Sequence, residues 1–268
     1  MTHTPPLKTS AAPAWDGLPM PRRLWAIVAV AFGVSLSVID GAIANVALPT
    51  IGRELGISEA DSIWIVNAYQ LAIMVSLLSF SALGDVVGYR KIYLGGLALF
   101  TLASVGCACS YSFATLVLTR VLQGFGAAAV TSVNTTLIRN IYPRAQLGRG
   151  MGINATVVAV SAVAGPTLAA AILSVASWPW LFAVNIPVGV TAFVLSRRYL
   201  PQNPVLVRDH RFDWRDGVLN ALTFGLLIAS IEGFSHGLDP RLIAFGVAAL
   251  LLIGFFFVRR QLREPYPL

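Results

Sequence analysis

Residues 24–48 read LWAIVAVAFGVSLSVIDGAIANVAL, and Asp40 is the only charged side chain among them. A transmembrane helix needs about 20 consecutive apolar residues, so this stretch is long enough to cross a bilayer. Further apolar runs follow along the chain, at residues 63–83, 92–109, 113–138, 151–176, 180–195, 218–231 and 242–258. Together the runs predict an all-α polytopic membrane protein with about eight spans.

The overall composition excludes an ordinary soluble protein. Of the 268 residues, 56% are hydrophobic and only 12% are charged, whereas about 25% are charged in a typical soluble domain. The segments between the apolar runs are too short to hold a separate aqueous domain. Chemistry that needs such a domain, including ATP hydrolysis, would have to come from a partner.

The distribution of positive charge predicts the orientation in the membrane. The net charge is +7, and the chain has 19 Lys and Arg residues. Arg53 and Arg241 lie on one side, Arg120 lies inside a span, and all the others lie in the alternate gaps and at the two ends. By the positive-inside rule, both termini are cytoplasmic. This placement assigns the basic residues to topology beside a lipid bilayer, and we expect no nucleic-acid partner.

The spacing of the runs divides the chain into parts. We expect a disordered cytoplasmic tail, a bundle of six helices, a cytoplasmic linker rich in Pro and Arg, an additional transmembrane helix pair and a cytoplasmic end. Their residues are 1–23, 24–195, 196–217, 218–258 and 259–268 respectively. The spans are rich in Gly, Ala and Ser, which let helices approach closely in lipid.

Two ionisable residues lie well within the spans, and such residues are usually functional. Asp40 is either a packing carboxylate satisfied by hydroxyls such as those of Ser35 or Ser37, or a carboxylate in a water-filled cavity that takes up a proton or attracts a cation. Arg120 either clamps helices together through an ion pair or carbonyls, or tunes the proton affinity of a nearby acid.

Two glycine-containing segments also suggest function. The sequence SALGDVVGYRK at residues 81–91 joins the second and third runs on the cytoplasmic side. Its glycines permit a tight turn, and Asp85 can pair with arginines or favour a neighbouring helix N-terminus. In the fifth run, Gly165 precedes Pro166, which removes a backbone hydrogen bond and should kink the helix.

Four motifs in order resemble those of the major facilitator superfamily, and within it the fourteen-span drug:proton antiporters. The signature loop is matched by Gly84, Asp85, Gly88, Arg90 and Lys91. The fourth-span pattern is matched by Leu116, Arg120, Gln123, Gly124, Gly126, Ala127 and Ala128. The antiporter motif is matched at Gly165 and Pro166, with Ser161, Ala169 and Ala170 in place of its other glycines. The first-span pattern is matched by Ile39, Asp40, Asn45, Val46, Ala47, Leu48 and Pro49, with Ala42 where Thr is usual.

The resemblance implies a multidrug exporter of the bacterial inner membrane that contributes to antibiotic resistance. Such a protein exports lipophilic, often cationic compounds by alternating access, with the proton gradient as energy source and no cofactor or metal. Asp40 would be the protonation or cation-sensing site, assisted by Arg120. The loop residues Gly84, Asp85, Gly88, Arg90 and Lys91 would form a cytoplasmic latch, and Gly165 and Pro166 would seal or bend a helix interface. The remaining motif residues would serve packing, namely Gln123, Gly124, Gly126, Asn45 and Pro49.

The resemblance covers only the N-terminal part of such a transporter. In this superfamily the substrate site lies near the midplane between two six-helix halves, and Leu268 stands where a second half would begin. We therefore expect a truncated chain, a half completed by a separate chain, or a homodimer, and we expect no dye resistance from the chain expressed alone. A non-transporting interaction module remains an alternative. A membrane-embedded enzyme is less favoured, because no run contains two carboxylates and the three histidines, His3, His210 and His236, lie outside the runs.

Overall fold

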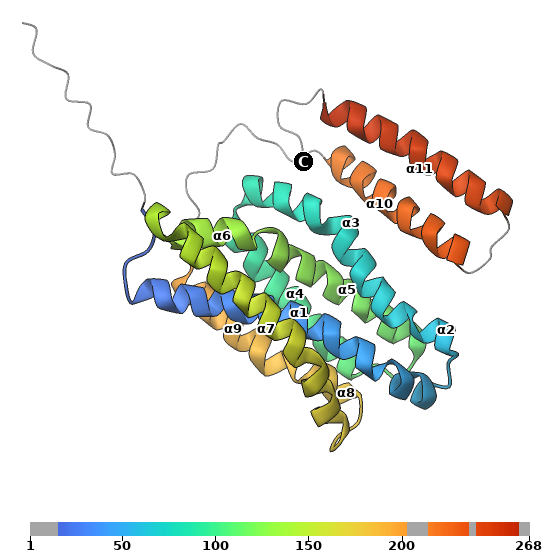
Figure 1. Ribbon diagram of the computed structural model, residues 1–268, viewed down its shortest axis with the longest axis horizontal. Coiled ribbons are helices and arrows are strands. Elements are labelled where there is room, and N and C mark those ends of the chain that lie inside the picture. The colour runs from blue at the N-terminus through green and yellow to red at the C-terminus, as the bar shows by residue number, and fades with distance from the viewer. Residues whose placement is uncertain (1–15, 203–213, 236–239, 263–268) are drawn as a thin grey trace, which may run out of the picture.

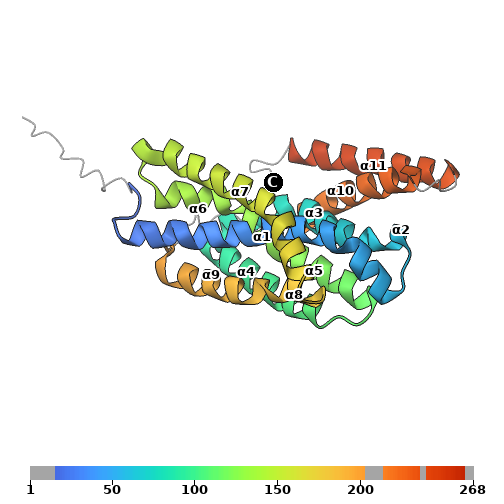
Figure 2. The ribbon, with the colours of Figure 1, turned by 60° about the horizontal axis from the view of Figure 1, so that its bottom comes forward.

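The computed structural model describes residues 16–202, 214–235 and 240–262, and every regular element in these ranges is helical. The elements follow one another as α1 (Arg22–Leu55), α2 (Glu59–Ser62), α3 (Trp64–Val87), α4 (Tyr89–Ala108), α5 (Phe113–Ser132), α6 (Asn134–Ile141), the 3-10 turn η1 (Arg144–Gln146), α7 (Leu147–Leu173), α8 (Pro179–Ala183), α9 (Asn185–Tyr199), α10 (Trp214–Ser235) and α11 (Pro240–Gln261). Helices α1 to α9 form one bundle, and α10 with α11 lies to one side of it beyond α3 (Figure 1, Figure 2).

The helices confirm the all-α membrane architecture. Within the described residues, 7 helical stretches are long and apolar enough to cross a membrane. They are Arg22–Leu55, Glu59–Val87, Tyr89–Ala108, Phe113–Ile141, Arg144–Leu173, Pro179–Tyr199 and Ala244–Gln261. The predicted run at residues 218–231 is absent from that set, but it forms α10, which pairs with α11 as a hairpin. The arrangement is consistent with about eight spans.

Local sequence signals set the ends of these helices. Gly56 ends α1 with a φ of 64°, a left-handed conformation that glycine adopts without steric cost. The Ser58 side chain then accepts a hydrogen bond from the Asp61 amide and begins α2. Ser112 and Thr115 form a reciprocal capping box at the start of α5. Each turn therefore satisfies backbone groups that a helix end would otherwise leave unpaired.

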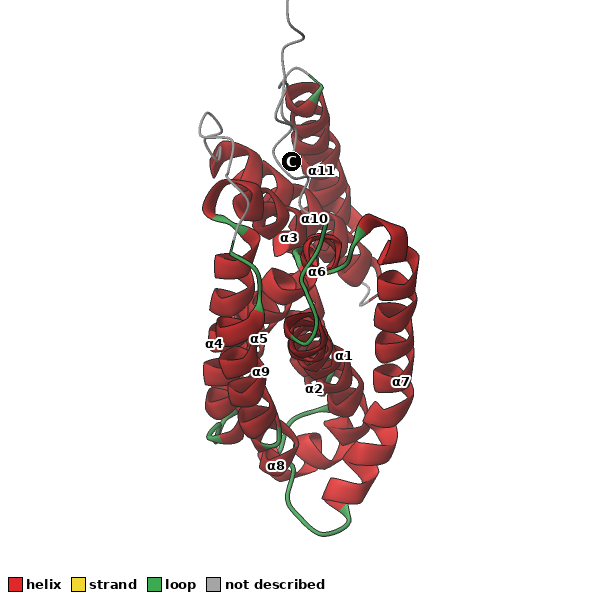
Figure 3. Ribbon diagram, turned by 90° about the vertical axis from the view of Figure 1, so that its left-hand side faces the viewer, coloured by secondary structure: helices red, strands yellow, loops and turns green. Residues whose placement is uncertain are grey.

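Small residues bring the helices of the bundle close together. A Cβ atom built on Gly126 of α5 would lie 2.6 Å from the Phe100 amide nitrogen in α4, so the two backbones are in direct contact there. On the other side of the bundle, a Cβ atom on Gly165 of α7 would lie 2.5 Å from the Ala42 Cβ atom in α1. Helix α7 packs along α1, across from α4 and α9, and so lies at the edge of the bundle (Figure 3).

The additional helix pair is attached to the bundle through α3. The Asn220 side chain of α10 is buried and donates a hydrogen bond of 2.9 Å to the Val75 carbonyl. Asp216 at the start of α10 forms an ion pair with Arg260 near the end of α11. Helix α9 runs on to Tyr199 and α10 already begins at Trp214, so helix occupies both ends of the predicted linker, while residues 203–213 lie outside the described chain.

The N-terminal segment differs from the predicted disordered tail. The Leu18 side chain is only 1% exposed, and its amide donates a hydrogen bond of 2.9 Å to the Ile141 carbonyl at the end of α6. Asp16 accepts a hydrogen bond of 3.0 Å from the Arg144 amide. Leu18 and Asp16 thus attach this segment to the turn between α6 and α7, although most of residues 16–23 are exposed. Residues 1–15 lie outside the described part of the structure.

The C-terminal segment begins later than predicted. Helix α11 continues through Arg259 and Arg260 to Gln261, so the first residues of the expected cytoplasmic end belong to the last helix. Residues 263–268 lie outside the described ranges.

Candidate functional site

Asp40 and Arg120 form a buried ion pair at the centre of the bundle that helices α1 to α9 form. Asp40 comes from the middle of α1 and Arg120 from α5, and their side chains are 1% and 0% exposed. The distance between Arg120 Nη1 and Asp40 Oδ2 is 2.5 Å. The sequence singled out both residues separately, and the fold brings them together across 80 positions of the chain.

Two buried amides complete the surroundings of the Asp40 carboxylate. Its Oδ1 atom accepts hydrogen bonds from Gln123 Nε2 of α5 at 2.9 Å and from Asn185 Nδ2 of α9 at 2.6 Å. Gln123 Nε2 also donates to the Ser104 hydroxyl of α4 at 2.9 Å. We call Asp40, Arg120, Gln123, Asn185 and Ser104 the Asp40 cluster. The cluster joins four helices through side chains alone.

The Arg120 guanidinium has further contacts that hold it in place. Its Nε donates to the Ile65 carbonyl of α3 at 3.1 Å, and its Nη1 donates to Gln123 Oε1 at 2.7 Å. Its central carbon lies 4.1 Å from the centre of the Tyr69 ring, a distance suited to a cation–π interaction. Its Nη2 atom is buried without a hydrogen-bond partner among the described residues.

This arrangement has a definite electrostatic consequence. Each charge alone would be costly inside a low-dielectric bundle, and the pair is tolerated because the partners and their hydrogen bonds neutralise each other. A proton added to Asp40 would remove the counter-charge of Arg120. The Asp40 cluster can therefore link the protonation of one carboxylate to the packing of the helices that meet there.

The hydrogen-bonding partners of Asp40 differ from those expected from the sequence. The carboxylate is enclosed by side chains of the described residues, and its uptake of a proton stays a prediction. The proposed packing partners Ser35 and Ser37 bond elsewhere, Ser37 to the Val34 carbonyl and Ser35 to Ser161 of α7. For Arg120, the interhelical ion pair and carbonyl contact are present, and they also place it beside the acid that it could tune.

Sequence reasoning missed some members of the Asp40 cluster. Gln123 was assigned to packing, yet its amide is a hydrogen-bonding partner of both charged residues. Asn185 and Ser104 were not singled out. The available signal was a polar residue inside an apolar run, which Asn185 provides in the run at residues 180–195. The packing role expected for Gly124 and Gly126 matches their close approaches to the backbones of α3 and α4.

The cytoplasmic loop places its motif residues in different environments. Gly88 has a φ of 109° and connects α3 to α4 without an intervening loop. Asp85 accepts a hydrogen bond from the Tyr89 hydroxyl, and Arg90 donates one to the Arg197 carbonyl near the end of α9. Gly84 is buried, whereas Asp85 and Lys91 are exposed. The loop therefore contacts α9 through Arg90, while Asp85 bonds a tyrosine hydroxyl at the start of α4.

The antiporter motif in α7 and the first-span motif in α1 are only partly buried. Gly165 contacts α1 directly, while Pro166 is exposed within an α7 helix that continues on both sides of it. Asn45 and Pro49 of α1 were expected to serve packing, but both are exposed. The Asn45 side chain only returns to the Gly41 carbonyl of its own helix, at 3.2 Å. Both residues lie on a face of α1 that no described element covers, and their packing role stays a prediction.

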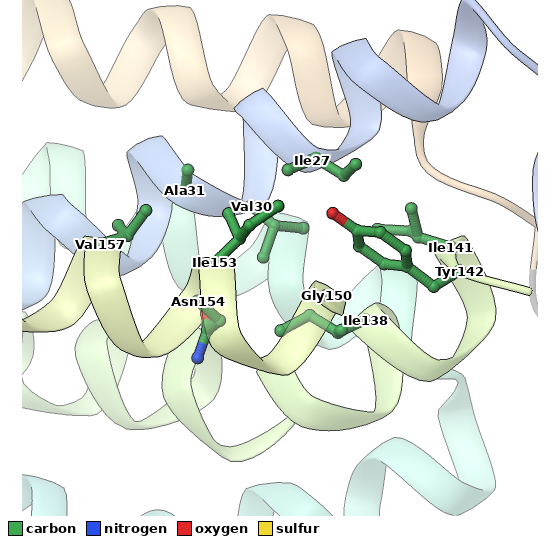
Figure 4. A pocket seen from close by; sticks show the side chains of 10 residues that line it. All are labelled: Ile27, Val30, Ala31, Ile138, Ile141, Tyr142, Gly150, Ile153, Asn154 and Val157. Atoms are coloured by element: carbon green, nitrogen blue, oxygen red, sulfur yellow. The ribbon is translucent and has the colours of Figure 1, made fainter. Parts of the chain in front are cut away.

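A small apolar pocket lies apart from the Asp40 cluster, between α1, α6 and the first half of α7 (Figure 4). No member of the cluster lines it. The lining residues are Ile27, Val30, Ala31, Ile138, Ile141, Tyr142, Gly150, Ile153, Asn154 and Val157. Its polar groups are the Tyr142 hydroxyl and the Asn154 amide, so the pocket offers no charge to a ligand.

Comparison with known proteins identifies the family. The sequence profile described as Major Facilitator Superfamily matches residues 30–264. The chain belongs to the Major Facilitator Superfamily. Together with the membrane-capable helices of the described residues, this membership confirms the predicted multi-pass membrane protein, and it favours a transporter over an enzyme.

Individual relatives agree with this family. The chain is 57% identical over 253 residues to the uncharacterized transporter YebQ of Escherichia coli, covering 94% of this chain and 55% of YebQ. It is 34% identical to the riboflavin transporter RibZ of Clostridioides difficile, covering 91% and 52% of the two chains. It is 35% identical to the putative multidrug resistance protein MdtD of Salmonella typhi, covering 86% and 50%. The chain thus spans about half the length of the curated relatives it matches.

A solved structure supports the same fold. The bacterial homolog of the human lysosomal transporter Spinster, in an inward-facing and unoccupied conformation, superposes with a TM-score of 0.59 at 17% sequence identity. The match covers 87% of this chain and 59% of that chain. At this identity the likeness concerns the fold alone.

Proposed function

We propose that this chain supplies the proton-coupling half of an exporter of lipophilic, often cationic compounds, driven by the proton gradient. The observation that carries the proposal is the buried Asp40–Arg120 pair with its two amide partners. Ionisable groups placed so deeply between membrane helices commonly mark proton relays. The MdtD relative, a putative multidrug resistance protein, supports the substrate class.

The chemistry of Asp40 explains how a proton could drive the cycle. As an anion, Asp40 neutralises Arg120 and accepts three hydrogen bonds from α5 and α9. As a neutral acid it would leave the Arg120 charge buried without a counter-ion, which is strongly unfavourable in the present packing. A conformation in which Arg120 is better solvated would then gain population. Protonation would in this way bias the two states between which the transporter alternates.

The substrate path would lie on the face of α1 and α7 that the other described elements leave open. In this superfamily the site is formed between two six-helix halves near the midplane. Asn45 and Pro49 of α1 and Val163 of α7 are exposed on this chain. An apolar surface of this kind suits lipophilic substrates. We propose that transport requires a second six-helix half, and that the Arg90 contact with α9 belongs to its cytoplasmic latch.

Riboflavin is a second candidate substrate. The observation that favours it is the 34% identity to the riboflavin transporter RibZ over 91% of this chain. Riboflavin is planar and uncharged at neutral pH, so it would not need a carboxylate for binding. Competition between riboflavin and a lipophilic cation in one assay distinguishes the two substrate classes.

The decisive experiment joins this chain to the part of YebQ that its match does not cover. Inverted membrane vesicles containing the chimera are energised with a pH gradient, and ethidium transport is followed by fluorescence. We expect transport by the chimera, none by the chain alone, and loss of transport in Asp40→Asn. Asp61→Asn, on an exposed residue of α2, is the matched control and should transport normally. Equal transport by Asp40→Asn and the unchanged chimera would refute the coupling role of Asp40, and transport of riboflavin alone would refute the substrate class.

A further inference from the structure

Within the described chain, the hydrogen-bonding partners of the Asp40 carboxylate are all donors. Oδ2 accepts from Arg120, and Oδ1 accepts from the amide nitrogens of Gln123 and Asn185. A carboxylate can use all of these donors, because it is purely an acceptor. A protonated carboxyl group carries an O–H donor and needs an acceptor, and burying such a donor without a partner is unfavourable. If Asp40 is protonated, one neighbour must therefore present an acceptor in place of a donor.

Two of the three partners cannot make this change readily. Arg120 has donors and no acceptor. Gln123 is held at both ends of its amide, since Nε2 donates to Asp40 and Ser104 while Oε1 accepts from Arg120 and from the Cys107 thiol. Turning the Gln123 amide would set its nitrogen against the Arg120 guanidinium, and several hydrogen bonds would be lost at once.

Asn185 is differently placed. It is 2% exposed at the start of α9, and the hydrogen bond that the structure gives its side chain is the one to Asp40. Because the amide is nearly symmetric in shape, a half-turn about its terminal bond exchanges the nitrogen and the oxygen without changing the packing. The turned amide would accept from a protonated Oδ1 at the position where it now donates.

We infer that Asn185 is a positioning residue that matches its hydrogen bond to the protonation state of Asp40. The inference rests on the proposed proton-coupling role of Asp40. The step is balanced: one proton, supplied by the gradient, adds to Asp40 Oδ1, and the N–H···O contact from Asn185 is replaced by an O–H···O contact to it. The other titratable side chains in contact with the cluster within the described chain are Tyr69, whose hydroxyl donates to the Ser37 carbonyl, and Cys107.

The same residue connects the proton to the movement of a helix. Asn185 begins α9, and the other end of α9 receives hydrogen bonds from Arg22 of α1 at the Tyr199 carbonyl and from Arg90 of α4 at the Arg197 carbonyl. A change in the hydrogen bond at one end of α9 therefore acts on a helix that is tied to α1 and α4 at the other end.

Infrared difference spectroscopy of the chain in lipid nanodiscs, recorded across a pH titration, tests this directly. The carboxyl C=O band of protonated Asp40 is identified by its loss in Asp40→Asn. In Asn185→Leu, which removes both the donor and the acceptor, we expect this band to move to higher wavenumber, because the acid O–H has lost its acceptor. Asn185→Gln restores an amide and should return the band toward its original position. Asn134→Leu is the control, since it removes a buried amide that bonds Asn154 instead of Asp40.

The outcomes separate the two proposals. If no carboxyl band is lost in Asp40→Asn, the proton site itself is wrong and the proposed function fails. If the band is lost in Asp40→Asn but keeps its position in Asn185→Leu, the role of Asn185 is overturned and the proposed function stands. Should Asn185→Leu fail to insert, Asn185→Ser takes its place, because its hydroxyl is too short to reach Asp40.

Transport gives an independent readout in the YebQ chimera. We expect Asn185→Leu to lower pH-driven ethidium transport by at least about tenfold. The free-energy cost of leaving one buried polar group unsatisfied is large enough for a change of this size. Substrate exchange at equal pH on both sides should persist, because it needs no change in the protonation of Asp40. A variant that loses exchange and pH-driven transport together would contradict a specific role in coupling.

Discussion

A double-mutant cycle on Asp40 and Arg120 gives a quantitative expectation for the buried ion pair. In Asp40→Leu the guanidinium, which is 0% exposed, keeps the Ile65 carbonyl and the Tyr69 ring but has no counter-charge. In Arg120→Met the carboxylate keeps only two amide donors, from Gln123 and Asn185. Removing one partner of a buried pair costs about 3–5 kcal/mol, so each variant should lose that much free energy of unfolding.

The double variant should be far less destabilised than the sum of the single variants. It contains no buried charge, and its main cost is two amides that have lost Asp40 as a partner, at about 1–3 kcal/mol each. From the midpoints of these ranges, the two single variants together lose about 8 kcal/mol and the double variant about 4 kcal/mol. The coupling free energy between the two positions is then about 4 kcal/mol, somewhat above the range of about 0.5–3 kcal/mol that is usual for directly interacting residues.

The assay is reversible unfolding of the chain in bicelles, by titration with a denaturing detergent and detection by circular dichroism. Additivity of the two single variants to within about 0.5 kcal/mol would refute the reasoning, because independent sites behave in that way. The conservative variants Asp40→Glu and Arg120→Lys separate the effect of charge from that of geometry, since both keep the charges while altering the geometry of the contact.

Three further predictions concern the packing and topology of the bundle. Gly165→Val should separate α7 from α1 and lower the midpoint of thermal unfolding in detergent, because its Cβ atom would lie 2.5 Å from that of Ala42, whereas an equal midpoint would refute the contact. Leu18→Ala should destabilise the chain by about 2–4 kcal/mol in the same unfolding assay, as expected for a buried leucine, and a neutral effect would show that the N-terminal segment is not packed. A reporter fused at Arg144 should be cytoplasmic and one fused at Glu59 periplasmic, and the reverse result would refute the orientation.

The sequence was sufficient for the architecture because apolar length determines which segments can span a bilayer. The six membrane-capable stretches of the bundle and the additional helix pair lie close to the predicted runs. The run at residues 218–231 was harder to judge, since α10 carries Asn220 and Asp216, whose partners in α3 and α11 are known only once the helices are packed. The packed segment around Leu18 was missed for a similar reason, because a short proline-containing stretch has no periodicity that indicates burial.

The functional site was only half predictable. Asp40 and Arg120 stand out because a charge inside an apolar run is rare and costly. Their contact with each other could not be deduced, because no local rule states which faces of α1 and α5 meet. Asn185 is visible in the sequence only as a polar residue inside an apolar run, and its importance comes from its hydrogen bond of 2.6 Å to Asp40, which is known only once α1 and α9 are packed.

The most direct test of proton coupling is proton movement caused by the substrate itself. Vesicles containing the YebQ chimera are loaded with a pH-sensitive dye, and a lipophilic cation is added in the absence of an imposed pH gradient. The proposed function predicts a substrate-induced pH change that is abolished by Asp40→Asn and retained in Asp61→Asn. An equal pH change in Asp40→Asn at matched expression would contradict the claim that Asp40 carries the coupled proton.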